Sequence, residues 1–128
     1  MKIVVVDDDE VVLQWVRQHL EARDYEVEDA LSGEQGLHHY VSQGPTGWDF
    51  VLSDYLFIPS KKVKDGLQLV REIRAINPQQ RMAIHTSEKG LRAPVPVLHK
   101  PYQIGELLRL LREPMTSLMP LLIEPSDE

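Results

Sequence analysis

The sequence predicts an α/β fold in which a doubly wound, five-stranded parallel sheet is covered by helices on both faces. The chain opens with a continuous β-branched run, Ile3 to Val6, which is typical of a strand buried on both faces of a parallel sheet. Short apolar runs then alternate with segments whose apolar residues recur at helical spacing. Such alternation indicates right-handed crossovers between parallel strands.

The expected strands cover residues 3–6, 25–30, 48–53, 82–85 and 95–99. Asp9 is suited to cap the first helix and Ser32 the second, with Gln35 completing a capping-box pattern. Two more helices are expected at about 66–76 and 103–112. Pro78 ends the first of these, because proline disfavours helical conformation in the residue before it.

The connection between the fourth and fifth strands is short. Ser87 to Pro94 leaves eight residues, fewer than the roughly 10–12 that a crossover containing a helix requires. Because Gly90 also lies inside this stretch, we expect a loop or a single turn. The helix of this crossover is therefore predicted to be reduced or absent.

Composition narrows the classes of function. The 128 residues suit one compact domain, and the formal net charge of −6 argues against nucleic acid as a direct partner, because basic patches bind phosphate backbones. The absence of cysteine excludes disulfides, zinc–thiolate sites and thiol catalysis. The early apolar run is too short for a signal peptide or a membrane span, so we expect a cytoplasmic protein without a membrane partner.

Polar residues gather where the expected strands end, and this edge of a parallel sheet is where ligands bind. They are Asp7, Asp8 and Asp9 after the first strand, Asp54 after the third, Thr86 after the fourth and Lys100 after the fifth. Carboxylates in one crevice repel one another unless a cation joins them, and oxygen ligands suit Mg²⁺. A lysine and a hydroxyl there could bind a phosphoryl group, with Asp54 as nucleophile. Each residue alone has an ordinary explanation, and for Asp9 we prefer helix capping.

The sequence resembles the response-regulator receiver domains (CheY-like) of two-component systems. The resemblance lies in the order of the residues that follow the strands: Asp7 and Asp8, then Asp54, Thr86 and Lys100. The resemblance covers residues 1 to about 112 and implies a flavodoxin-like strand order of 2-1-3-4-5. It implies Asp54 as the phosphoacceptor and Mg²⁺ as the cofactor. The other implied roles are direct metal ligation by Asp8, metal binding mainly through water by Asp7, ligation by the backbone carbonyl of Leu56, a switch hydroxyl on Thr86 and phosphate pairing by Lys100.

The resemblance also implies a phosphorelay function. The phosphoryl group would come from a histidine kinase or a histidine phosphotransfer protein, and the chain would catalyse its own phosphorylation and dephosphorylation rather than act as an enzyme on other molecules. A downstream protein target is expected, and homodimer formation is open. Leu56 and Glu88 occupy positions that tune hydrolysis in the family, and Val97 stands where many members keep an aromatic switch residue. An apolar Leu56 cannot orient an attacking water, which predicts a long-lived phosphoryl state.

Two other functions compete with this interpretation. A pseudo-receiver would keep the fold as a protein-interaction module without phosphorylation, and the shortened fourth crossover favours it. A haloacid-dehalogenase-type phosphatase would use Asp7 as nucleophile in the pattern Asp7-x-Asp9. That alternative needs an acidic pair after Lys100 and leaves Asp54 without a role.

The C-terminal residues 113–128 are expected to form a proline-containing apolar tail that follows a receiver domain of residues 1–112. Three prolines exclude a long regular helix there, yet the segment is too apolar for a plain solvated tail. It could fold back over the surface left by the missing helix or contact a partner. His85 and His99 are expected to pack beside the sheet rather than to take part in chemistry.

Overall fold

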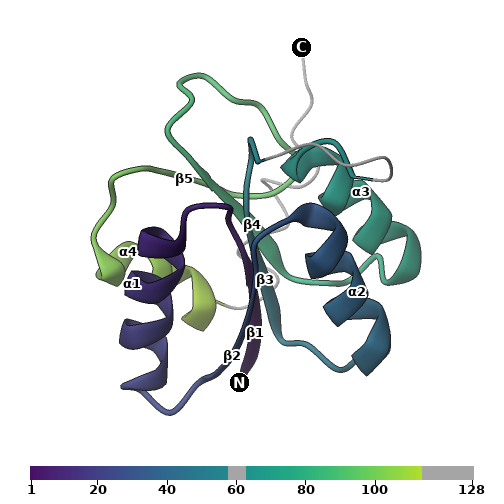
Figure 1. The fold of residues 1–128 in the computed structure, drawn as a ribbon, viewed down its shortest axis with the longest axis horizontal. Helices are drawn as coiled ribbons and strands as arrows, with labels where there is room; N and C mark the ends of the chain where they lie inside the picture. Colours follow the sequence, from purple (N-terminus) through teal and green to yellow (C-terminus); the bar gives the residue numbers. More distant parts are fainter. Residues whose placement is uncertain (58–62, 114–128) are drawn as a thin grey trace.

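A computed structural model describes residues 1–57 and 63–113 of the chain (Figure 1). Five strands form one parallel sheet in the order β2-β1-β3-β4-β5, which confirms the predicted fold and strand order. The strands are β1 (Lys2–Val6), β2 (Glu26–Ala30), β3 (Phe50–Asp54), β4 (Met82–Thr86) and β5 (Val97–His99). The helices are α1 (Glu10–Glu21), α2 (Gly33–Gln43), α3 (Gly66–Ile76) and α4 (Ile104–Arg112).

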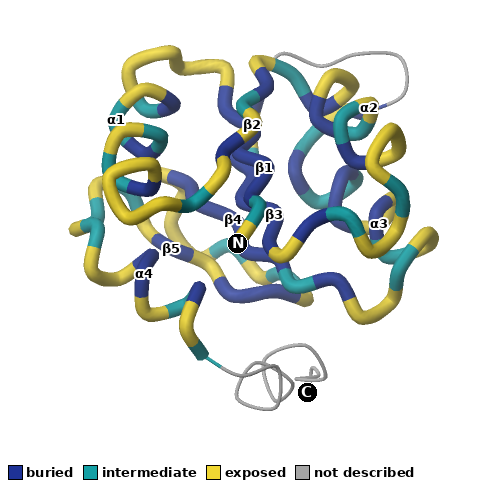
Figure 2. The backbone as a smooth tube through the Cα atoms, turned by 90° about the horizontal axis from the view of Figure 1, so that it is seen from below, coloured by how far each residue is buried: buried dark blue, intermediate teal, exposed yellow. Residues whose placement is uncertain are grey.

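The two faces of the sheet have separate apolar cores. Helices α2 and α3 cover one face, while α1 and α4 cover the other (Figure 1). The central strands are buried, and the outer surfaces of the helices are exposed (Figure 2). Side chains alternate along a strand, so Ile3 and Val5 face α1 and α4, as do Phe50 and Leu52. The same alternation directs Asp54, which ends β3, and Asp7, which follows β1, toward this face.

The connection from β4 to β5 contains no helix, as expected. Residues 87–96 form turns and irregular structure, with Gly90 at a positive φ of 74°. Val95 is buried in the core beneath α2 and α3, so the connection itself covers part of that face. Strand β5 begins at Val97 rather than at the predicted residue 95, because Pro96 has no N–H to donate to the sheet.

The predicted helix caps are present with one difference. Asp9 Oδ1 accepts the Val11 N–H at 2.9 Å, and Ser32 Oγ accepts the Gln35 N–H at 3.1 Å. The Gln35 side chain accepts the N–H of Leu31 instead of that of Ser32, so the reciprocal bond of a capping box is displaced by one residue.

The expected apolar tail lies outside the described residues from position 114 onward. Within the part of the chain that the structure describes, no helix has the length and apolar character needed to cross a membrane.

Candidate functional site

Three carboxylates meet at the carboxyl ends of β1 and β3. The two strands are paired side by side, with Val6 opposite Ser53, so the residues that follow them are neighbours. One oxygen from each of Asp7, Asp8 and Asp54 can be chosen so that all three lie within 4.8 Å of one another. Asp7 is fully buried and Asp54 is 7% exposed, whereas Asp8 is open to solvent. Because like charges repel at this separation, the cluster is suited to a cation.

Lys100 supplies one positive charge between two of these carboxylates. Its Nζ lies 2.7 Å from Asp7 Oδ2 and 3.5 Å from Asp54 Oδ1. The backbone places it there, because the Lys100 N–H donates to the carbonyl of Thr86 at 2.8 Å and so continues the pairing of β5 with β4. One ammonium against three carboxylates leaves a net negative site that fits a divalent ion with oxygen ligands.

Asp7 has further partners besides Lys100. Its Oδ1 accepts the Asp9 N–H at 2.9 Å. His85 Nε2 lies 2.9 Å from Asp7 Oδ2, although the carboxylate is outside the angular range of a hydrogen bond from that nitrogen. Burial alone would raise the pKa of Asp7, but its contacts with His85, Lys100 and the Asp9 backbone outweigh burial and lower the pKa to about 2. Asp7 is therefore a persistent buried anion.

Asp54 is in the opposite electrostatic situation. Burial, and secondly the charge of Asp7, raise its pKa to about 6, while Lys100 and the Tyr55 N–H offset only part of this effect. The Tyr55 N–H donates to Asp54 Oδ1 at 2.9 Å. The ionised form of Asp54 is thus disfavoured where that of Asp7 is favoured, and a bound cation would stabilise it.

Gly66 closes the site from the side of α3. Its N–H donates to the carbonyl of Tyr55 at 2.7 Å. A Cβ at this position would lie 2.1 Å from the backbone carbonyl oxygen of Asp54, so only glycine allows the approach. Asp65 caps α3 by accepting the Gln68 N–H at 2.9 Å. Helix α3 therefore begins in direct contact with the backbone of Asp54.

Thr86 ends β4, the neighbouring strand. Its side chain is buried, and Oγ1 accepts the Glu88 N–H at 3.0 Å. Leu56, two residues beyond Asp54, has an exposed side chain, as does Val97 on β5.

His85, one residue before Thr86, connects the carboxylates to the face covered by α1 and α4. It is fully buried, pairs in register with Asp54, and has its Nδ1 2.7 Å from the hydroxyl of Tyr102. The edge of the Trp15 ring meets Tyr102 at a centroid distance of 5.6 Å.

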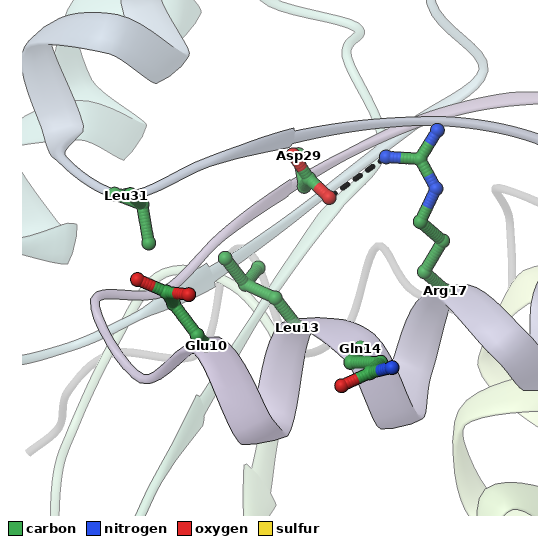
Figure 3. Close-up of a pocket in the computed structure, with 6 residues that line it drawn as sticks. All are labelled: Glu10, Leu13, Gln14, Arg17, Asp29 and Leu31. Carbon is green, nitrogen blue, oxygen red and sulfur yellow. Dashed lines mark hydrogen bonds and ion pairs between the residues drawn. The ribbon is translucent and has the colours of Figure 1, made fainter.

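A hollow whose lining includes none of Asp7, Asp8 and Asp54 lies between α1 and β2 (Figure 3). Its lining residues are Glu10, Leu13, Gln14, Arg17, Asp29 and Leu31. Arg17 Nη1 and Asp29 Oδ2 are 2.8 Å apart within it, so these two charges are already paired with each other.

A family model described as the response regulator receiver domain matches residues 3–112. The chain belongs to this family. Receiver domains of this CheY-like type act in two-component signalling, and this membership does not support the alternative of a haloacid-dehalogenase-type phosphatase. A comparison with curated protein sequences found no match.

Solved receiver domains have the same fold. A CheY-like receiver domain protein from Methanospirillum hungatei JF-1 has a TM-score of 0.77 at 23% identity, covering 91% of this chain and 94% of that one. A receiver domain from Clostridium thermocellum has a TM-score of 0.71 at 26% identity, covering 86% and 90%. The response regulator TrrA from Thermotoga maritima, solved in complex with Mg²⁺-BeF, has a TM-score of 0.73 at 23% identity, covering 84% and 93%.

The receiver domain brings four of the predicted site residues into contact range of one another, namely Asp7, Asp8, Asp54 and Lys100. The sequence interpretation missed His85 as a partner of the site. The expectation that it packs beside the sheet agrees with its burial, but its contact with Asp7 was not foreseen. The same expectation is wrong for His99, which is exposed. The signal that could have found His85 is strand alternation combined with the pairing of β3 and β4, which sets it opposite Asp54.

Proposed function

We propose that this receiver domain accepts a phosphoryl group on Asp54, with Mg²⁺ held beside it by Asp7 and Asp8. The observation that carries the proposal is the cluster of three carboxylates within 4.8 Å, together with the ammonium of Lys100 between Asp7 and Asp54. In this proposal Asp8 ligates the metal directly, Asp7 acts mainly through water, and the backbone carbonyl of Leu56 completes the ligand set.

The donor set fits Mg²⁺. All side-chain ligands are carboxylate oxygens, and the exposed Asp8 leaves room for the waters that Mg²⁺ usually retains. When bound, the ion offsets the negative charge of the carboxylates and of phosphoryl oxygens. The Mg²⁺-BeF complex of the Thermotoga maritima regulator, which has the same fold, supports this assignment.

The transfer step assigns a role to each side chain. A lone pair of the Asp54 carboxylate forms the O–P bond while the N–P bond of a phosphohistidine breaks, and the electron pair stays on the imidazole, which takes up a proton. The donor is a histidine kinase or a histidine phosphotransfer protein. Lys100 pairs with the phosphoryl oxygens. Thr86 Oγ1 accepts a backbone N–H and can still donate its own proton to a phosphoryl oxygen.

The same proposal gives the phosphoryl group a long lifetime. Hydrolysis needs a water held in line with the phosphorus atom, and the side chain at the tuning position, Leu56, is apolar and 51% exposed. Such a side chain offers no hydrogen bond to orient that water. Glu88 is exposed at the second tuning position. Slow loss of phosphate from the purified phosphoprotein is expected, and rapid loss would contradict this part of the proposal.

The test is incubation with Mg²⁺ and a small acyl phosphate, read by intact mass and by size-exclusion chromatography. Wild-type protein should gain the mass of one phosphoryl group, and Asp54→Asn should gain none. Asp9→Asn is the matched control, because Asp9 is adjacent to the cluster but caps α1. A mass gain that survives Asp54→Asn contradicts the proposal. The chromatogram shows whether phosphorylation changes the oligomeric state.

The second candidate is a phosphorylation-independent pseudo-receiver that binds a protein partner. Two observations favour it: the connection from β4 to β5 has no helix, and the switch position carries an exposed valine, Val97. The complete set of carboxylates and Lys100 opposes it. No change in mass on incubation with the phosphodonor, and no spectral response to beryllofluoride, would favour this candidate.

A further inference from the structure

The buried carboxylate of Asp7 is shared between two cationic or proton-donating side chains. Its Oδ2 lies 2.7 Å from Lys100 Nζ and 2.9 Å from His85 Nε2. His85 is fully buried, and its Nε2 has no aligned hydrogen-bond partner in the described residues. A buried ring nitrogen without an aligned partner is costly and calls for an explanation.

The protonation of the three groups follows from their chemistry. A carboxylate only accepts, so His85 Nε2 must carry the proton that faces Asp7. A neutral ring that carries its proton on Nε2 accepts at Nδ1. The hydroxyl of Tyr102 lies 2.7 Å from that Nδ1 and donates to it. The ring of His85 is thereby fixed in one tautomer with its N–H toward Asp7.

Lys100 cannot pair closely with both Asp7 and the phosphoryl oxygens once Asp54 carries a phosphoryl group. Its Nζ is already 3.5 Å from Asp54 Oδ1, so a short movement brings it to the phosphoryl oxygens. That movement would leave Asp7 Oδ2 buried without its ammonium. A small rotation of the carboxylate would then align it with the waiting N–H of His85.

We infer that His85 is a positioning residue, which retains the Asp7 carboxylate when Lys100 turns from Asp7 to the phosphoryl group on Asp54. The inference rests on the proposed function. His85 does not touch the phosphoryl group in this scheme. It acts through Asp7, and Tyr102, which packs against Trp15, holds it from the α1–α4 side.

Two substitutions separate this role from simple packing. The amide nitrogen of His85→Gln can reach the place of Nε2 and donate to Asp7. His85→Asn is shorter, so its amide reaches the place of Nδ1, near Tyr102, but not Asp7. Calorimetry should measure the affinity for Mg²⁺ alone and for beryllofluoride at saturating Mg²⁺, with thermal unfolding as the measure of stability.

His85→Asn should lower the beryllofluoride affinity about tenfold, the effect of one buried acceptor left without its donor. Its Mg²⁺ affinity should change by less than about threefold, because Lys100 still holds Asp7 in that state. His85→Gln should stay within about threefold of wild type in both measurements. Should His85→Asn fail to fold, Tyr102→Phe provides the second measurement, since it removes the group that orients His85 and should weaken beryllofluoride binding in the same direction.

The outcomes distinguish the inference from the function on which it rests. Equal losses of beryllofluoride affinity in the glutamine and asparagine variants, in proportion to lowered thermal stability, would make His85 a packing residue and overturn the inference. A beryllofluoride affinity in His85→Asn equal to that of the wild type would also overturn the inference. The proposed function would still hold in that case if the wild type showed Asp54-dependent phosphorylation. A wild type that gains no Asp54-dependent mass overturns both.

Discussion

The strand ends of β1 and β3 and the connection from β4 to β5 both belong to the carboxyl edge of the sheet, yet the chain holds them in different ways. At the strand ends, Asp7 and Asp54 are buried and fixed by bonds to backbone N–H groups and to Lys100. The connection is largely exposed from Ser87 to Gly90 and is attached to the core mainly through Val95. The difference shows that a crossover can lose its helix without disturbing side chains whose positions are set by strand register.

This contrast bears on how a signal would leave the site. The carboxylates and Lys100 are in place for phosphoryl chemistry, whereas the segment beyond Thr86 has no helix to move. One continuous path from the carboxylates runs through His85 and Tyr102 to the face of α1 and α4. Experiments that damage one region and spare the other test the contrast directly.

The largest effect is expected from truncation of the core beneath the carboxylates. Leu52 on β3 is fully buried, so Leu52→Ala should lower the free energy of unfolding by about 4 kcal/mol. Leu91 in the connection is only partly buried against the core, and Leu91→Ala should cost about 1 kcal/mol. Urea unfolding of both variants measures the difference. Equal losses would mean that the connection is as firmly packed as the sheet.

The second effect concerns the close approach of α3 to Asp54. Gly66→Ala places a Cβ 2.1 Å from the Asp54 carbonyl oxygen, and relief requires movement of backbone, so we expect a loss of about 3 kcal/mol and weaker Mg²⁺ binding. Gly105→Ala is the matched control, because its Cβ meets nothing within 4 Å and lies in α4, where alanine should add about 0.5 kcal/mol. Unchanged Mg²⁺ affinity in Gly66→Ala would show that the site does not depend on this contact.

The sequence could predict the strand ends and the connection from β4 to β5 to different extents, because different physical properties of the chain indicate each. The β-branched run and the helical periodicities indicate which residues are buried, so the positions of strands and helices were predictable from them. The strand order followed from the resemblance to receiver domains. The missing helix was predictable from chain length, since the eight residues expected between Thr86 and Val95 are too few for a helical crossover; the observed connection, residues 87–96, is only slightly longer.

The contacts within the site were less accessible to sequence reasoning. Asp7, Asp54 and Lys100 could be placed at one edge because each follows a strand. The role of His85 depends on which face it occupies and on a tyrosine 17 positions further along the chain. Such a contact is set by tertiary packing between β4 and the segment before α4, and no local pattern in the sequence encodes it.

The third effect is electrostatic. Because burial and Asp7 raise the pKa of Asp54 to about 6 from the ordinary 3.8, its ionised form destabilises the metal-free protein above pH 6. Asp54→Asn should therefore raise the free energy of unfolding at pH 7.5 by about 2 kcal/mol without metal, a value reduced from the full shift because the cluster is partly open to water. Saturating Mg²⁺ should shrink the difference. A destabilised asparagine variant would contradict this account.

The same carboxylates set the pH dependence of the wild type without metal. Relative to Asp54→Asn, the stability of the wild type should rise as pH falls from about 6 to 4, because folded protein then binds the proton of Asp54 while the unfolded chain does not. Burial lowers the pKa of His85, so the unfolded chain binds that proton first, which lowers the stability of both proteins over the same range. Below pH 4 stability should fall, since the pKa of Asp7 is lowered to about 2 and protonation of the unfolded chain then competes. Thermal midpoints of both proteins measured across this range should therefore show the gap between the wild type and Asp54→Asn narrowing as pH falls from about 6 to 4.

The smallest effect is expected in the connection itself. Gly90 has a φ of 74° and open space where a Cβ would lie, so Gly90→Ala should cost about 1 kcal/mol through backbone strain alone. Phosphoryl uptake should remain at the wild-type rate, because nothing in the connection touches the carboxylates in the described contacts. Gly44→Ala is the control for strain remote from the site, with a φ of 85° and similarly open space. If Gly90→Ala slowed phosphoryl uptake and Gly44→Ala did not, the connection would be coupled to the site through Thr86 despite its missing helix, and the division between the two regions would fail at that residue.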